Sequence, residues 1–201
     1  MAEEITKEEI QRLMGIKGNV RGAILQAHAI FIKNKEGEEG LDAIEKKMAE
    51  LSYPVNFKKI RVGEWYPESL STLIILTAKG LFNWTEEDIL EMGGSSPKYN
   101  FIAKILMRYF ISLEKFIAEV PKYWDKHLDC GRLEVAQFDE EKKYIILREK
   151  DFKFHPILCI YHAGYYQGIT EYVIKSEKIS VEETRCIFKG DPYNEYAITW
   201  K

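Results

Sequence analysis

The hydrophobic pattern of this 201-residue chain changes its period near residue 130, and the change limits the folds available to it. Before that point apolar residues recur at helical spacing, whereas afterwards alternating segments flank one helical segment. We therefore expect an α+β protein, with a helical lobe packed on a small antiparallel sheet and the C-terminal order strand, strand, helix, strand, strand. At this length we expect one domain, 1–201, with the helical lobe over 1–129 and the sheet with its long helix over 130–201.

Capping residues, glycines and prolines divide the helical part. Thr6 and Glu9 predict a capping box for a first helix that ends near Met14. Further helices are expected over 20–35, 41–51 and 68–79 and from Thr85 to Gly93-Gly94. One or two more are expected from Phe101 to about His127, with Pro121 as a break or kink inside them.

The second part reads as two hairpins around a helix. Residues 133–148 predict a hairpin with its turn at 139–143, and strands over 179–189 and 195–200 predict another. Between them a helix from Pro156 to Lys175 carries an apolar and aromatic face. On that helix Gly164 and Gly168 are four residues apart, a spacing that permits the close approach of another element.

Composition and missing motifs exclude several classes of protein. With 29 Lys and Arg against 32 Asp and Glu, the net charge of −3 does not favour nucleic-acid binding. No apolar run approaches the length of a membrane span, and the first residues do not resemble a signal peptide, so we expect a cytoplasmic protein. The motifs of serine hydrolases, P-loop enzymes, zinc proteases and dinucleotide-binding enzymes are absent, which ranks catalysis below binding.

The three cysteines, Cys130, Cys159 and Cys186, do not form a disulfide framework of paired residues. Cys159 begins the last helix and His162 follows it by three residues, so both share a helix face. Glu183 and Cys186 lie on a segment that folds back on this helix. These four side chains are suitable zinc ligands, although buried thiols and an aromatic-face histidine explain the pattern without a metal.

Of the remaining histidines, His28 stands among apolar neighbours in the predicted helix 20–35. A buried imidazole needs a hydrogen-bond partner, so His28 is either a satisfied core residue or a residue that faces a ligand cavity. His127 and His155 flank predicted element boundaries, where we expect surface or capping residues.

The tail resembles the 4-vinyl reductase domain. The resemblance is carried by residues 159–173, CIYHAGYYQGITEYV, and 181–191, VEETRCIFKGD. In its zinc-containing members, which are sensor domains, the ligands are a helical cysteine, a Glu-x-x-Cys and a later cysteine. The resemblance implies that Cys159, Glu183 and Cys186 match the first three positions, with Asn194 at the fourth. His162 or water is the replacement ligand we consider.

Most of the chain resembles the heme-nitric-oxide-binding domain, which shares its overall fold with 4-vinyl reductase domains and some transport-particle subunits. Segments 20–25, VRGAIL, and 35–40, KEGEEG, carry this resemblance together with the helices that follow. The family binds heme through a helical histidine and a Tyr-x-Ser-x-Arg motif. Tyr144 and Arg148 match that motif with Ile146 replacing serine, but Lys115 stands where the histidine is expected. Heme binding in the family manner is therefore not expected.

These observations predict a small-molecule sensor domain with an apolar cavity for a hydrophobic or aromatic ligand. The candidate ligand-binding residues are His28, Phe31, Tyr144, Arg148 and Tyr165. An ordinary strand pair is the alternative role for Tyr144 and Arg148. No cofactor other than zinc is expected. The alternative functions are a tetrapyrrole-binding or heme-based gas sensor, and a protein-interaction module of the transport-particle type. A homodimer or a separate signalling partner would receive the signal.

Overall fold

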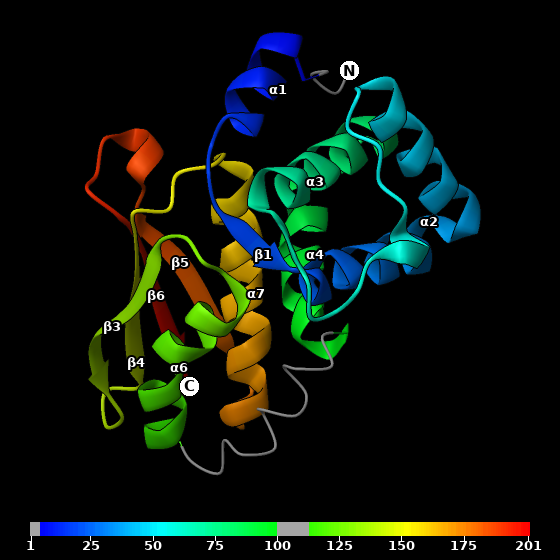
Figure 1. Ribbon diagram of the computed structural model, residues 1–201. Coiled ribbons are helices and arrows are strands. Elements are labelled where there is room, and N and C mark those ends of the chain that lie inside the picture. The colour runs from blue at the N-terminus through cyan, green and yellow to red at the C-terminus, as the bar shows by residue number, and fades with distance from the viewer. Residues whose placement is uncertain (1–4, 100–112) are drawn as a thin grey trace.

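The computed structural model describes residues 5–99 and 113–201 and confirms the α+β class (Figure 1). The helical lobe contains α1 (Lys7–Met14), β1 (Asn19–Arg21), α2 (Gly22–Glu50), η1 (Phe57–Lys59), β2 (Trp65–Pro67), α3 (Glu68–Phe82) and α4 (Glu86–Tyr99). Helix α6 (Leu113–His127) follows. The second lobe, the sheet lobe, contains β3 (Arg132–Asp139), β4 (Tyr144–Lys150), α7 (Ile157–Val173), β5 (Ile179–Arg185), η2 (Ile187–Lys189) and β6 (Asn194–Trp200).

The C-terminal sheet has the strand order β3-β4-β6-β5, with every neighbouring pair antiparallel. Along β4 the side chains of Ile145, Leu147 and Glu149 are buried and the alternate ones are not, as a sheet covered on one face requires. Helix α7 lies between this sheet and the helical lobe (Figure 1). Both lobes therefore pack against the same helix.

Helix α6 joins the two lobes. It packs on β3 and on β1, and Leu128, just beyond its end, bridges to Val20. Pro121 lies inside the helix and does not break it. The first part of the helix expected from Phe101, up to residue 112, lies outside the described residues.

Several predicted boundaries are confirmed and others move. Thr6 and Glu9 form the expected capping box of α1. The two helices expected over 20–35 and 41–51 are both present within α2, separated by a break at Gly37, where φ is 77°. Val20 lies in β1 instead, and the strand expected over 179–189 ends at Arg185.

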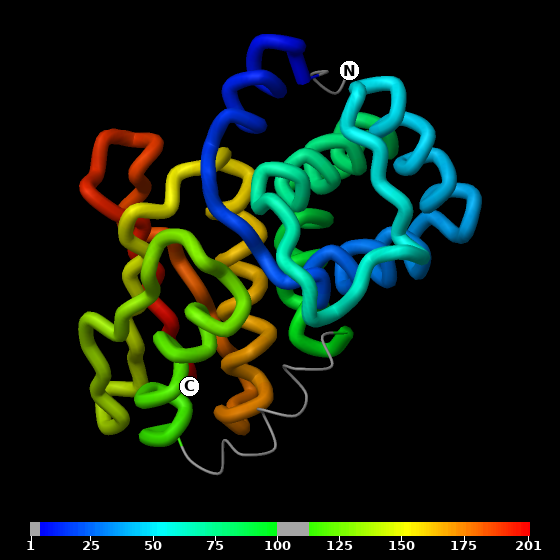
Figure 2. Tube along the Cα trace, viewed as in Figure 1, coloured from blue at the N-terminus to red at the C-terminus, as the bar shows by residue number. Residues whose placement is uncertain are grey.

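The prediction that Gly93 and Gly94 end a helix is wrong, because α4 continues through them to Tyr99. These glycines lie on the face of α4 that packs against α7, and the two helices run side by side in the tube view (Figure 2). A Cβ atom on Gly93 would lie 1.9 Å from the Tyr161 carbonyl oxygen, and one on Gly164 would lie 1.9 Å from that of Leu90. The predicted close approach at Gly164 and Gly168 is confirmed, and its partner is α4.

Among the helices of the described ranges, 5–99 and 113–201, none combines the length and apolar character that a membrane crossing requires.

Candidate functional site

A cavity of about 50 Å³ lies where the two lobes meet. Its walls come from β1, the first turns of α2 and α3, the end of α6, β3 and the middle of α7. Most of the lining is apolar or aromatic. The lining residues are Val20, Ile24, Glu68, Ser71, Trp124, His127, Leu128, Leu133, Leu158, Tyr161, His162, Tyr165 and Tyr166.

Helix α7 supplies the largest part of the lining. Leu158, Tyr161, His162, Tyr165 and Tyr166 follow one another at helical spacing and form one stripe that faces the cavity. This stripe belongs to the aromatic face that the sequence predicts, so Tyr165 lies where a ligand-binding residue is expected.

His127 was expected as a surface or capping residue at an element boundary. It is the last residue of α6, but it is 2% exposed and lines the cavity. Its Nδ1 lies 3.0 Å from the carbonyl oxygen of Tyr123. Because a carbonyl only accepts, Nδ1 carries the proton and Nε2 of the neutral ring is an acceptor. Nε2 is buried and has no partner in the described structure. Burial lowers the pKa of His127 to about 4, so the ring is neutral at pH 7.

Glu68 begins α3 and its side chain lines the same cavity while being only 3% exposed. Thr72 Oγ1 lies 3.4 Å from Glu68 Oε1 but 2.9 Å from the Glu68 carbonyl oxygen, which takes its hydrogen bond. Within the described ranges, Glu68 forms no ion pair with Lys or Arg. Burial raises its pKa to about 8, while His162 and hydrogen bonds from Thr72 and Ser71 act in the opposite direction.

His28 lies behind the cavity wall. Its Nε2 is 3.0 Å from Ser71 Oγ, its ring packs edge-on against Tyr161 at 5.3 Å, and its Nδ1 has no described partner. Burial lowers its pKa to about 3. His28 therefore supports two lining residues and does not itself line the cavity.

A second buried polar cluster lies on the sheet side of α7. Glu149 is 1% exposed, and its Oε1 accepts from the Tyr166 hydroxyl at 2.6 Å and from Nδ1 of His162 at 2.7 Å. Its Oε2 accepts from Nδ2 of Asn194 at 3.2 Å. Burial alone would lower the pKa of His162, but the Glu149 carboxylate raises it above its usual value. We call Glu149, His162, Tyr166 and Asn194 the Glu149 cluster.

Three predicted ligand-binding residues lie away from the cavity. Phe31 packs edge-on against Trp84 at 5.5 Å in the helical core. Tyr144 and Arg148 are the half-buried alternate residues of β4, so strand alternation directs them away from the buried face. The Arg148 guanidinium donates from Nε to Glu195 Oε2 at 2.6 Å, an internal carboxylate in place of a ligand. Lys115, aligned with the heme-ligating histidine, is exposed.

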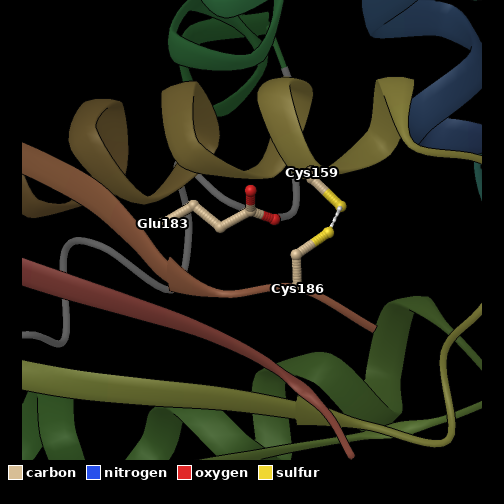
Figure 3. Close-up of side chains that lie close together, drawn as sticks. All are labelled: Cys159, Glu183 and Cys186. Atoms are coloured by element: carbon tan, nitrogen blue, oxygen red, sulfur yellow. Dashed lines mark hydrogen bonds between the residues drawn. The ribbon is translucent and has the colours of Figure 1, made fainter. Parts of the chain in front are cut away.

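The predicted metal ligands Cys159, Glu183 and Cys186 lie together, with ligand atoms within 4.8 Å of one another (Figure 3). Their two sulfur atoms are 3.9 Å apart. Burial and then the Glu183 carboxylate raise the pKa of the Cys159 thiol. His162 does not join them, because its Nδ1 binds Glu149.

Asn194, expected at the fourth metal position, has a different role. Its Oδ1 accepts from the Ile187 backbone N–H at 2.9 Å, and its Nδ2 donates to Glu149. His155 is the capping residue that the sequence predicts, since its Nδ1 accepts from the Ile157 N–H at 3.0 Å.

Solved structures share this architecture. An H-NOX protein from S. oneidensis in its Fe(II)NO ligation state aligns over 90% of this chain and 99% of its own, with a TM-score of 0.66 and 13% identity. An oxygen-binding H-NOX domain related to soluble guanylate cyclases aligns over 90% and 95%, with a TM-score of 0.61 and 16% identity. The chain has the H-NOX fold. No family model matches the sequence, and neither does any curated protein sequence.

The fold similarity confirms the wider resemblance to heme-nitric-oxide-binding domains, whereas the resemblance to 4-vinyl reductase domains and transport-particle subunits stays a prediction. Sequence reasoning missed Glu68, Ser71 and Glu149. Glu68 follows Pro67 at a helix start, where an acidic residue is ordinarily exposed. Glu149 occupies an inward position of β4, one residue beyond the hairpin expected over 133–148, and its alternation with Leu147 was the one available signal.

Proposed function

We propose that this chain is a ligand-binding sensor domain in which the cavity beside α7 takes a small molecule. The observation that carries the proposal is a cavity between the two lobes with an unpartnered, buried His127 Nε2 in its lining. Since about 10–15 Å³ holds one water-sized group on this measure, roughly three to five non-hydrogen atoms fit. An aromatic ligand requires lining side chains to move.

Binding to this cavity is testable with xenon, which enters apolar cavities of proteins. Xenon should change the NMR signals of lining residues such as Leu133 and Leu158. The variant Leu133→Phe, which fills part of the cavity, should lose that response while keeping the fold. An unchanged response in Leu133→Phe, or no response in the original protein, contradicts the proposal.

Heme does not fit this cavity in the family manner. A space for roughly three to five atoms is far smaller than the macrocycle. The residue aligned with the iron ligand is the exposed Lys115, and Arg148 already holds Glu195. We therefore assign heme no step here.

A heme-based gas sensor is the second candidate, because the similar solved structures are H-NOX proteins and because His127 offers an unprotonated Nε2, the atom type that ligates heme iron. Hemin titration followed by absorption spectroscopy separates the candidates. A stoichiometric Soret band that disappears in His127→Ala, but not in Lys115→Ala, establishes the heme sensor. No Soret band supports the non-heme sensor.

Zinc at Cys159, Glu183 and Cys186 is proposed as an accompanying structural site. Two zinc-bound sulfurs in a tetrahedral site lie about 3.8 Å apart, close to the observed 3.9 Å. Glu183 Oε1 is buried without a described partner, which fits a cation beside it. Zinc would displace thiol protons and link α7 to the end of β5. Metal analysis of protein purified without added metal tests this, with Cys186→Ser as the control that loses it.

Signal output from such a domain requires another surface, and we propose a homodimer or a separate signalling partner. Light scattering with and without xenon tests the homodimer.

A further inference from the structure

The cavity presents one buried hydrogen-bond acceptor without a described donor, His127 Nε2, and beside it a buried carboxyl group, Glu68. His127 Nε2 is an acceptor because Nδ1 donates to the Tyr123 carbonyl. The Glu68 carboxyl group is contacted by the hydroxyls of Thr72, at 3.4 Å, and of Ser71, and it forms no ion pair with a Lys or Arg of the described ranges. Both groups are at least nine-tenths buried and line one cavity. A buried acceptor without a donor is costly, so a ligand that brings donors gains affinity there.

The surrounding charges favour a positive ligand. His162 also lines the cavity and could donate a hydrogen bond, but its Nδ1 already lies 2.7 Å from Glu149 Oε1. His162 is thus held by Glu149 and acts on Glu68 without a hydrogen bond to it, and no Lys or Arg of the described ranges pairs with Glu68.

The walls also favour a cation. Trp124, Tyr161 and Tyr165 line the cavity, and aromatic rings attract a cation electrostatically when water is excluded. Their carbon surfaces equally accept the alkyl part of a ligand.

We propose that the cavity binds a small alkylammonium ion, whose N–H groups donate to the Glu68 carboxylate and to His127 Nε2 while its carbons contact the aromatic walls. This inference rests on the proposed sensor function and names its ligand class. The cavity size limits the ligand to roughly three to five non-hydrogen atoms.

Binding should release a proton. The titratable groups around Glu68 are His162 and Tyr161 on α7, His127 on α6 and Cys130 just after α6. Because the pKa of Glu68 is raised to about 8, an ammonium ion must displace its proton at lower pH. The affinity should therefore rise about tenfold per pH unit between pH 6 and 8.

The test is an NMR titration of the full chain with ethylammonium chloride, and with ethanol as the neutral molecule of the same size. We expect a dissociation constant in the millimolar range for ethylammonium, as three non-hydrogen atoms allow, and at least tenfold weaker binding of ethanol. Glu68→Gln should weaken ethylammonium binding at least tenfold at pH 8. The exposed control Glu182→Gln should leave it unchanged.

The results separate this inference from the proposed function. Equal affinity of Glu68→Gln and the original protein for ethylammonium, or preference for ethanol, overturns the ammonium ligand. If xenon still enters the cavity in that case, the sensor proposal stands without it. If neither xenon nor ethylammonium enters, both proposals fail. If Glu68→Gln fails to fold, His127→Phe, which keeps a ring without the acceptor, gives the same comparison.

Discussion

Two buried carboxyl groups, Glu149 on β4 and Glu68 on α3, both act on His162 of α7 but differ in their surroundings. Glu149 accepts from three side chains within 3.2 Å, whereas Glu68 has only the hydroxyls of Thr72 and Ser71 beside it and faces a cavity. A fully hydrogen-bonded buried charge holds the elements that contact it in one arrangement. A buried carboxyl group without such partners reduces stability and is typical of a binding site. The comparison therefore assigns attachment of α7 to Glu149 and ligand binding to Glu68.

Removing Glu149 should have the largest effect. Glu149→Ala leaves the buried groups of His162, Tyr166 and Asn194 without their shared acceptor, so the free energy of unfolding should fall by about 3–5 kcal/mol. Urea denaturation measures the change, and Glu182→Ala should stay within about 0.5 kcal/mol of the original protein. A loss below about 1 kcal/mol would mean that the Glu149 cluster does not hold α7.

Neutralising Glu68 should have the opposite sign. At pH 8 the unfolded chain ionises this residue freely, whereas burial in the folded protein opposes ionisation. Glu68→Gln removes that penalty, so the free energy of unfolding should rise by about 1–3 kcal/mol at pH 8. At pH 5 the gain should shrink to below about 1 kcal/mol, because the folded Glu68 is neutral there. Destabilisation at pH 8 would contradict a poorly solvated Glu68.

The pH dependence of stability should have a maximum near pH 6.5. Below it, unfolding lets His28 and His127 take up protons that the folded protein excludes, since their pKa values are lowered to about 3 and about 4. Above it, unfolding lets Glu68 release its proton, since its folded pKa is about 8. Below pH 6.5 the two histidines take up more protons on unfolding than Glu68 releases, so the free energy of unfolding rises with pH. Above pH 6.5 the proton released by Glu68 dominates, so the free energy of unfolding falls as the pH rises.

The expected fall is about 1–2 kcal/mol from pH 6.5 to either pH 5 or pH 8, measured by urea denaturation across pH. Glu68→Gln should remove most of the alkaline decline. His127→Phe should reduce the acid decline. A profile that rises steadily to pH 8 would show that Glu68 is ionised in the folded protein.

The smallest effect is expected on the outer face of the sheet. Arg148→Ala removes a partly exposed ion pair with Glu195, so it should cost no more than about 1 kcal/mol. It should leave xenon and ethylammonium binding unchanged, because Arg148 does not line the cavity. Altered binding in this variant would restore the anion-binding role that the motif predicts.

Sequence patterns predicted the elements better than the contacts of single polar residues. The period change near residue 130 and the aromatic face of α7 are local signals, and both are confirmed. The cluster of Cys159, Glu183 and Cys186 was expected from the segment that folds back on the last helix and from the family resemblance, and the structure brings its members together.

The failures share a physical cause. His127 and Glu68 lie at helix ends, where local reasoning predicts exposure, but the other lobe covers them. Arg148 matched a motif by spacing, yet spacing does not decide which face of the sheet it occupies. Burial that depends on packing between distant segments leaves no local pattern.

The crossing of α4 and α7 has a mechanical consequence. Backbone meets backbone at Gly93 and Gly164, so no side-chain rotamer there can absorb a displacement. If a molecule that enters beside Tyr161 displaces α7, α4 must therefore move with it as one rigid unit. Another protein bound to the outer surface of α4 would then sense this displacement without touching the ligand.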